Sequence, residues 1–255
     1  MSDVKKVFED EYILVVDKPS GLIVHSDGRT EEDTLDNWVK ENYPALLDVG
    51  NPHTLDSGRY TSRWGIVNRL DRDTSGLILI AKDDQSFFDL QRQFRERVIV
   101  KKYLAKVYGK NEGEESGKIS EPISRHKKDP RIWVCGTGVG ERVTNKEAVT
   151  LYRFVSEGKQ SLLELTPITG RTHQLRLHTR FIGHPIVGDR KYGVSGIANE
   201  HGVEQIKKVL DTLNPNEIEV DKNSRLMLHA KSLEFMHPKT RESVLIESNT
   251  LTDFT

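Results

Sequence analysis

Residues 65–81 read GIVNRLDRDTSGLILIA, two apolar runs on either side of a polar centre. The flanks Gly65–Leu70 and Leu77–Ala81 predict short strands. Between them, Asp73–Gly76 is typical of a turn, because Asp and Ser side chains bond nearby backbone and Gly tolerates positive φ. The stretch therefore predicts a strand, a turn and a second strand, with charged side chains gathered at the turn.

Outward from this stretch, strand and helix patterns alternate irregularly. Strands are predicted at Val7–Lys18, Val98–Val107, Ala148–Val155, Ser161–Thr166 and Leu226–Phe235. Helices are predicted at Thr30–Leu47, Asp84–Glu96 and Gly170–Phe181, the last capped by Thr169 or Thr172. Asn51–Arg63 and Glu112–Gly117 are predicted to be loops. Without regular βα alternation, the order indicates an α+β fold with a mixed, largely antiparallel central sheet flanked by helices and loops.

The chain has 255 residues, a length that suits one large domain or two small ones. No linker or internal repeat divides it, so a single domain over residues 1–255 is expected, with a polar peripheral excursion at about 194–224. No apolar stretch is long enough for a membrane helix, and the N-terminus lacks a secretory signal pattern. The lone Cys135 excludes an internal disulfide and a cysteine-rich zinc site. These features favour a cytoplasmic protein.

The net charge is −1, which alone argues mildly against nucleic-acid binding. The charges are unevenly placed, however. Residues 95–110 hold six Lys/Arg and one acid, and residues 169–191 hold five Lys/Arg and one acid. Such stripes suit an anion-binding face, although ordinary solvated charge explains them equally well.

The first candidate for chemistry is Asp71, which lies between Arg69 and Arg72. Positive charge beside a carboxylate favours its ionised form, which serves as a nucleophile or a base. A turn in which Asp and Ser only cap backbone amides is the more frequent role of such a segment. Asp71 and Asp73 together could also form a glycosidase pair, but two aspartates two residues apart at a turn are a weak signal for one.

The second candidate is GRTHQLRLH at residues 170–178. In a helix, Thr172, His173, Arg176 and Arg180 fall near one face, which gives a cationic surface for Asp71 or for phosphate. A solvated basic face explains the same pattern. His173 and His178 lie too far apart around a helix for a metal site, so no metal is expected. Tyr103 could stack on a nucleobase, although a half-buried strand tyrosine is the commoner case. No nucleotide-binding glycine motif is present.

Three segments, NRLDRDTSG, KKYLAKVYG and GRTHQLRLHTRFIGHPIVGDRKYG, resemble in their order the RluA-type pseudouridine synthases. The opening EDEYILVVDKPSGLIVH and the closing LMLHAKSLEFMHPKT resemble the same family, so the likeness covers roughly residues 7 to 247. It implies an enzyme that isomerises specific uridines of structured RNA, rRNA or tRNA, without a cofactor and as a monomer. It also implies the single-domain branch without an N-terminal RNA-binding domain.

The resemblance also implies roles. Asp71 matches the essential catalytic aspartate, Tyr103 the tyrosine against the target base, and Arg176 the basic residue paired with the aspartate. Arg69 would enter the RNA helix where the target nucleotide leaves it. Further phosphate contacts are expected from Arg72, Arg171, His173 and Arg180. Asn68 departs from the pattern, since relatives usually have histidine there. Two rivals remain: an RNA-binding protein without activity, and a glycosidase or nucleosidase that uses Asp71 and Asp73.

Overall fold

The computed structural model describes residues 3–26, 32–50, 53–54, 60–61, 63–111, 113–126, 129, 131–136, 145–194, 225–250 and 254. The chain forms two compact units. The first comprises residues 1–101, 230–253 and 255, and the second residues 102–229 and 254. The predicted excursion at 194–224 lies, apart from Val194, outside the described residues. The single catalytic domain stays a prediction.

The first unit is built on an antiparallel meander. Its strands are β1 (Lys5–Glu9), β2 (Ile13–Lys18) and β5 (Ser75–Ala81), in the order β1-β2-β5. Next to β5 comes β12 (Leu228–Met236), whose residues from Ala230 on belong to this unit, and β13 (Ser243–Glu247) pairs with it. All residues of β2 and β5 are buried, which is why both read as continuous apolar runs.

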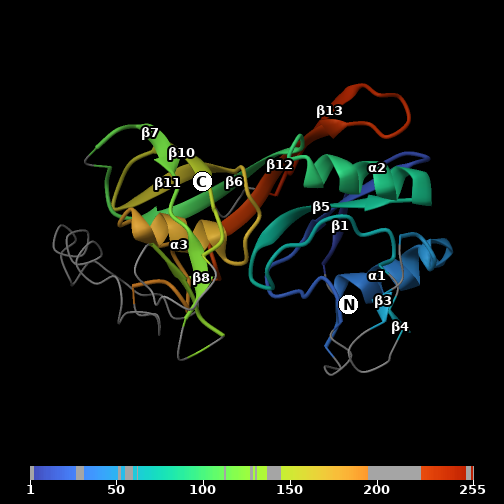
Figure 1. Cartoon of the computed structure of the whole chain (residues 1–255), viewed down its shortest axis with the longest axis horizontal. Helices are drawn as coiled ribbons and strands as arrows, with labels where there is room; N and C mark the ends of the chain where they lie inside the picture. The colour runs from blue at the N-terminus through green and yellow to red at the C-terminus, as the bar shows by residue number, and fades with distance from the viewer. Residues whose placement is uncertain are drawn as a thin grey trace. The chain divides into compact units, whose positions relative to one another are not determined.

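Two α-helices accompany these strands (Figure 1). α1 (Leu35–Asn42) is capped by Thr34 and followed by the short 3₁₀ helix η1 (Pro44–Leu46). α2 (Asp84–Arg95) begins at Asp83, whose carboxylate accepts bonds from the amide and hydroxyl of Ser86. Buried Phe87 and Leu90 lie on its inner face, and α2 packs against β5. Two-residue strands β3 (His53–Thr54) and β4 (Tyr60–Thr61) pair with each other.

The second unit carries an antiparallel sheet in the order β6-β11-β10-β7. Its strands are β6 (Val100–Tyr108), β11 (Gln160–Pro167), β10 (Thr150–Ser156) and β7 (Ser116–Ile119). A separate pair, β8 (Ile123–Arg125) and β9 (Trp133–Cys135), packs with α3 (Gln174–Phe181). Ile123, Ala148, Leu177 and Tyr192 form the apolar cluster beneath this helix.

The predicted α+β class with a largely antiparallel sheet is confirmed. The helix at 84–96 and the strands at 98–107, 148–155, 161–166 and 226–235 are also confirmed to within two residues at each end. The strand at 7–18 is two strands, and the helix at 30–47 is confined to α1 and η1. The loops predicted at 51–63 and 112–117 include β3, β4 and the start of β7. No described helix is long and apolar enough to span a membrane.

The strand predicted at Gly65–Leu70 is wrong. Only a single bridge joins Ile66 to Ile80, and Val67 donates to the carbonyl of Leu79 at 3.0 Å. The chain then stops pairing with β5, because the side chain of Asn68 takes the place of the next backbone carbonyl. Its Oδ1 accepts the bond from the Leu79 amide at 2.8 Å. The segment 68–74 is therefore a loop that carries its charged residues away from β5.

Candidate active site

Asp71 lies in the loop that precedes β5, in the first unit. Its side chain is half-buried, whereas Arg69 and Arg72 on either side are exposed and Leu70 points inward. The amide of Thr74 donates to the carbonyl of Asp71 at 3.2 Å, so residues 71–74 form a turn. It lies two residues earlier than the turn predicted at Asp73–Gly76, whose last two residues belong to β5. Gly76, the second residue of β5, has φ of +114°, and an added Cβ there would lie 2.4 Å from the carbonyl oxygen of Ala230. Only glycine allows β5 to lie so close to that backbone.

Lys18, the last residue of β2, bonds to the backbone of this turn. Its side chain is fully buried, and its Nζ donates to the carbonyls of Pro19 (2.9 Å), Leu22 (2.8 Å) and Arg72 (3.0 Å). An ammonium group has three donors, and here all three bond to backbone oxygens. One side chain therefore ties the loop after β2 to the residue that follows Asp71.

The burial of Lys18 has an electrostatic consequence. Loss of solvent lowers the pKa of Lys18 from 10.5 to about 8, although the charges of Asp73, Asp71 and Asp17 act in the opposite direction. At neutral pH Lys18 remains mostly charged. A buried cation thus lies close to Asp71.

Three further hydrogen bonds join the turn to residues 20 and 21. The amide of Gly21 donates to the carbonyl of Arg72 at 2.9 Å, and the hydroxyl of Ser20 donates to that of Asp73 at 2.6 Å. Arg72 returns a bond from Nε to the carbonyl of Gly21 and forms an exposed ion pair with Glu32. The backbone of residues 71–73 is therefore bonded on both sides, which limits the movement of the Asp71 side chain.

In the second unit, α3 begins at Gln174 rather than near Gly170. His173 is the N-cap and has left-handed φ and ψ of 57° and 18°, which interrupts the helical path. Neither predicted cap acts as one. The side chain of Gln174 instead accepts bonds from the amide of Arg171 (3.0 Å) and the hydroxyl of Thr169 (2.7 Å). Thr172 and His173 consequently precede the helix, and the predicted single helical face is wrong for them.

Arg176 lies within α3 and is almost fully buried. Its Nε and one terminal nitrogen donate to the two carboxylate oxygens of Asp189, both at 2.7 Å. The side chains of Arg176 and Asp189 are 6% and 1% exposed. Burial would raise the pKa of Asp189, but the charge and bonds of Arg176 together with two backbone amides hold it below its usual value. The pair is a bidentate, desolvated ion pair of defined geometry.

Tyr192 extends this cluster. The amide of Tyr192 donates to Asp189, and its ring lies 5.0 Å from the guanidinium carbon of Arg176. The Tyr192 hydroxyl is 2.7 Å from Nδ1 of His173, and it accepts a bond from the amide of Trp133. Arg176 is thus enclosed by an acid on one side and an aromatic face on the other, which fixes its orientation.

The remaining predicted residues lie in the second unit as follows. Arg180 is buried, and it donates to the carbonyl of Tyr192 at 3.5 Å. Arg171 donates from Nε to the carbonyl of Glu147. Tyr103 is half-buried in β6, opposite Leu165 of β11. The structure therefore groups His173, Arg176 and Arg180 around Asp189 and Tyr192, and it groups Arg69, Asp71 and Arg72 in the first unit.

Sequence reasoning missed Lys18, Asp189 and Tyr192. A signal existed for the first, since a lysine directly after the apolar run Tyr12–Val16 and before Pro19 lies where burial is expected. None existed for the pairing of Arg176 with Asp189, which a distance of 13 residues along the chain does not suggest. Among the described residues, no group of three His, Cys, Asp or Glu could hold a metal ion.

Comparison with known proteins supplies the context for these groups. The family model described as RNA pseudouridylate synthase matches residues 12–181. A ribosomal large subunit pseudouridine synthase D from Blochmanniella floridana is 36% identical over 236 residues, which are 92% of this chain and 65% of the relative. A ribosomal large subunit pseudouridine synthase C from Buchnera aphidicola is 35% identical and covers 94% of this chain. The chain spans 65% of the length of that relative too.

A solved structure has the same fold. Human RNA pseudouridylate synthase domain containing 1 superposes with a TM-score of 0.68 over 98% of this chain and 84% of its own length, at 25% identity. The segment matched by the family model contains Asp71, Tyr103 and Arg176.

Proposed function

Since the chain belongs to the RluA-type RNA pseudouridylate synthase family, we propose that it isomerises specific uridines of structured RNA to pseudouridine. The two bacterial relatives named above are ribosomal large subunit pseudouridine synthases. Large-subunit ribosomal RNA is therefore the first substrate to test and transfer RNA the second. The observation that supports the proposal is the turn of Asp71, an acid placed between two exposed arginines on a backbone held by a buried cation.

The reaction breaks the bond between N1 of uracil and C1′ of ribose, turns the base, and joins C5 to C1′. The proton on C5 leaves and N1 gains one, so the mass of the RNA does not change. We assign Asp71 the role of the catalytic carboxylate, acting as a nucleophile at C1′ or C6 or as a base at the sugar. No electrons and no phosphoryl group are transferred, so the reaction needs no redox or nucleotide cofactor.

The target nucleotide must first leave its stack, which costs a few kcal/mol. In the proposal Arg69 occupies the vacated place and Tyr103 lies against the extruded base, and both offset that cost. Arg176, oriented by Asp189 and Tyr192, supplies positive charge to the catalytic carboxylate. The exposed Arg69 and the half-buried Tyr103 suit these roles. Arg72, Arg171, His173 and Arg180 are the further proposed phosphate contacts.

The test is tritium release from ribosomal and transfer RNA that carry uridine tritiated at C5. Release with unchanged RNA mass supports the proposal. Free uracil or an abasic ribose would instead indicate a glycosidase that uses Asp71 and Asp73. Binding of RNA without any release would indicate an RNA-binding protein without activity. Mapping of pseudouridine by carbodiimide-dependent primer stops then locates the modified position.

A further inference from the structure

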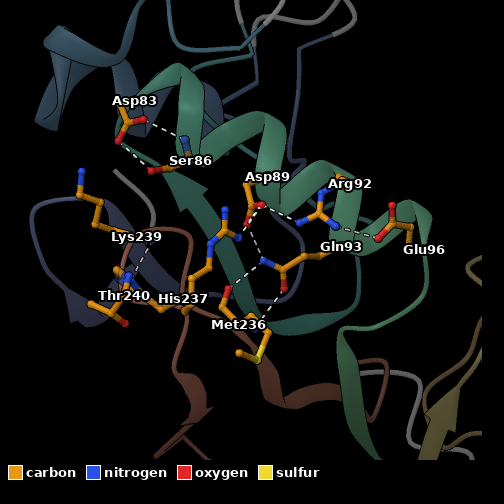
Figure 2. Close-up of polar contacts among 11 residues, drawn as sticks. Asp83, Ser86, Asp89, Arg92, Gln93, Glu96, Met236, His237, Lys239 and Thr240 are labelled. Atoms are coloured by element: carbon orange, nitrogen blue, oxygen red, sulfur yellow. Dashed lines mark hydrogen bonds and ion pairs between the residues drawn. The ribbon is translucent and has the colours of Figure 1, made fainter.

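The basic stripe at residues 95–110 is not explained by the catalytic roles above. Some of its charges are neutralised within the protein, since Lys102 lies 3.3 Å from Glu164. Near the end of α2, and among the described residues, one arginine is paired with acids and a later one is not. Arg92 is paired with Asp89 at 2.7 Å and with Glu96 at 2.9 Å, as Figure 2 shows. Five residues later, Arg97 makes no ion pair with a carboxylate in the described part of the chain.

Arg97 occupies a backbone position that normally belongs to glycine. Its φ is +61°, directly after the C-cap Glu96. The Arg97 amide bonds to the carbonyl of Phe94 at 3.2 Å and the Val98 amide to that of Gln93 at 3.1 Å. This is the Schellman arrangement, in which the left-handed residue is usually glycine. A side chain there costs about 1 kcal/mol relative to glycine.

Lys101 of β6 is the second unneutralised cation. It is half-buried, and its Nζ lies 5.8 Å from the centre of the Phe94 ring. Burial, and after it the charge of Arg97, lowers the pKa of Lys101. No carboxylate is paired with it among the described residues. Two like charges therefore lie close together in the first unit.

Such a pair is unfavourable in the free protein and becomes favourable when an anion lies between the charges. The side chain of Arg97 is exposed, whereas the ammonium group of Lys101 lies closer to the protein, beside Phe94. The two groups suit contact with a phosphate group that approaches from solvent. We propose that Arg97 and Lys101 form a binding site for the phosphate backbone of the RNA substrate. The inference rests on the proposed function, because it takes RNA as the ligand.

Three variants test the site: Arg97→Gly, Lys101→Gln and, as a control in the preceding helix α2, Arg92→Gln. Binding of a labelled RNA hairpin with uridines in its loop is measured between 50 and 200 mM salt. Each phosphate contact contributes about 0.7 to 0.9 to the slope of log K against log salt. Arg97→Gly and Lys101→Gln should each lower the slope by about that amount and weaken binding several-fold, whereas Arg92→Gln should keep the wild-type slope.

The Arg97→Gly variant separates binding from folding. Its melting temperature should equal or exceed that of the wild type, because glycine relieves the left-handed strain while RNA affinity falls. Wild-type slopes in both Arg97→Gly and Lys101→Gln would overturn the site, and so would a lowered melting temperature that accounts for weaker binding by Arg97→Gly. Tritium release is measured in parallel. A wild type that binds RNA but releases no tritium refutes the proposed activity and leaves the slopes to decide the site. A wild type that binds no RNA refutes both.

Discussion

The two units present an acid in opposite ways. Around Asp71 the fold bonds the backbone, through Lys18 and Gly21, and leaves the carboxylate half-buried. Around Asp189 the fold bonds the side chain itself, through both of its oxygens to Arg176, and buries it. An acidic residue that must reach a substrate needs a fixed backbone and an accessible carboxylate. An acidic residue that orients another side chain needs only a buried ion pair.

The largest expected effect comes from Asp71→Asn, which keeps the shape and removes the charge. We expect kcat for tritium release to fall at least about a thousandfold while the melting temperature stays near that of the wild type. Asp73→Asn is the matched control, since Asp73 lies two residues on in the same turn and is exposed. That control should retain activity within a few-fold. Equal loss in both variants would support a carboxylate pair instead, and substantial turnover by Asp71→Asn would refute the assignment.

Asp189→Asn tests the other half of the comparison. The variant leaves Arg176 charged and buried without its partner, which typically costs 3 to 5 kcal/mol, so we expect about that loss in the free energy of unfolding. Asp129→Asn is the control. Asp129 makes the same bidentate contact with Arg131 at the surface, where the Arg131 side chain is 86% exposed. Urea unfolding should show no measurable change for it, because exposed pairs contribute little. Equal stability of both variants would mean that burial of the pair is unimportant.

These contrasts mark what the sequence could predict. Strongly periodic elements such as Asp84–Arg95 and Thr150–Ser156 were predictable, because their apolar faces are local patterns. The motif and the family resemblance single out Asp71, and its catalytic role stays a prediction. The failures depend on features that the hydrophobic pattern does not record. Gly65–Leu70 reads as a strand, but a side-chain bond from Asn68 ends its pairing, and the N-terminus of α3 is delayed by the left-handed His173. Neither feature has a local sequence pattern.

Lys18→Met tests whether the turn needs its buried cation. The pKa of Lys18 falls from 10.5 in a solvated lysine to about 8 in the fold. Between these values the unfolded chain binds more protons, so the free energy of unfolding of the wild type rises as pH increases through this window. The full rise is on the order of 3 kcal/mol, and the variant should lack it.

Activity provides a second readout for Lys18. Because the turn loses its bond to the carbonyl of Arg72, kcat should fall about ten- to a hundredfold. Lys82→Met is the control, since Lys82 bonds Glu9 and the carbonyl of Asp10 in the same unit. It should keep both the pH-dependent rise and the activity. A Lys18→Met variant with wild-type kcat would show that the position of Asp71 does not depend on this residue.

The smallest expected effect concerns Asn68. Its Oδ1 replaces a backbone carbonyl opposite Leu79, so the chain can leave β5 and begin the turn of Asp71 without an unpaired amide. Asn68→Ala removes that acceptor and should lower the free energy of unfolding by about 1 kcal/mol, with kcat within about threefold of the wild type. Asn68→Asp retains an acceptor oxygen and should recover most of the stability. If alanine is as stable as asparagine, the Leu79 bond does not hold the loop. If kcat falls far more than threefold while the free energy of unfolding is unchanged, Asn68 has a role in the reaction beyond its bond to Leu79.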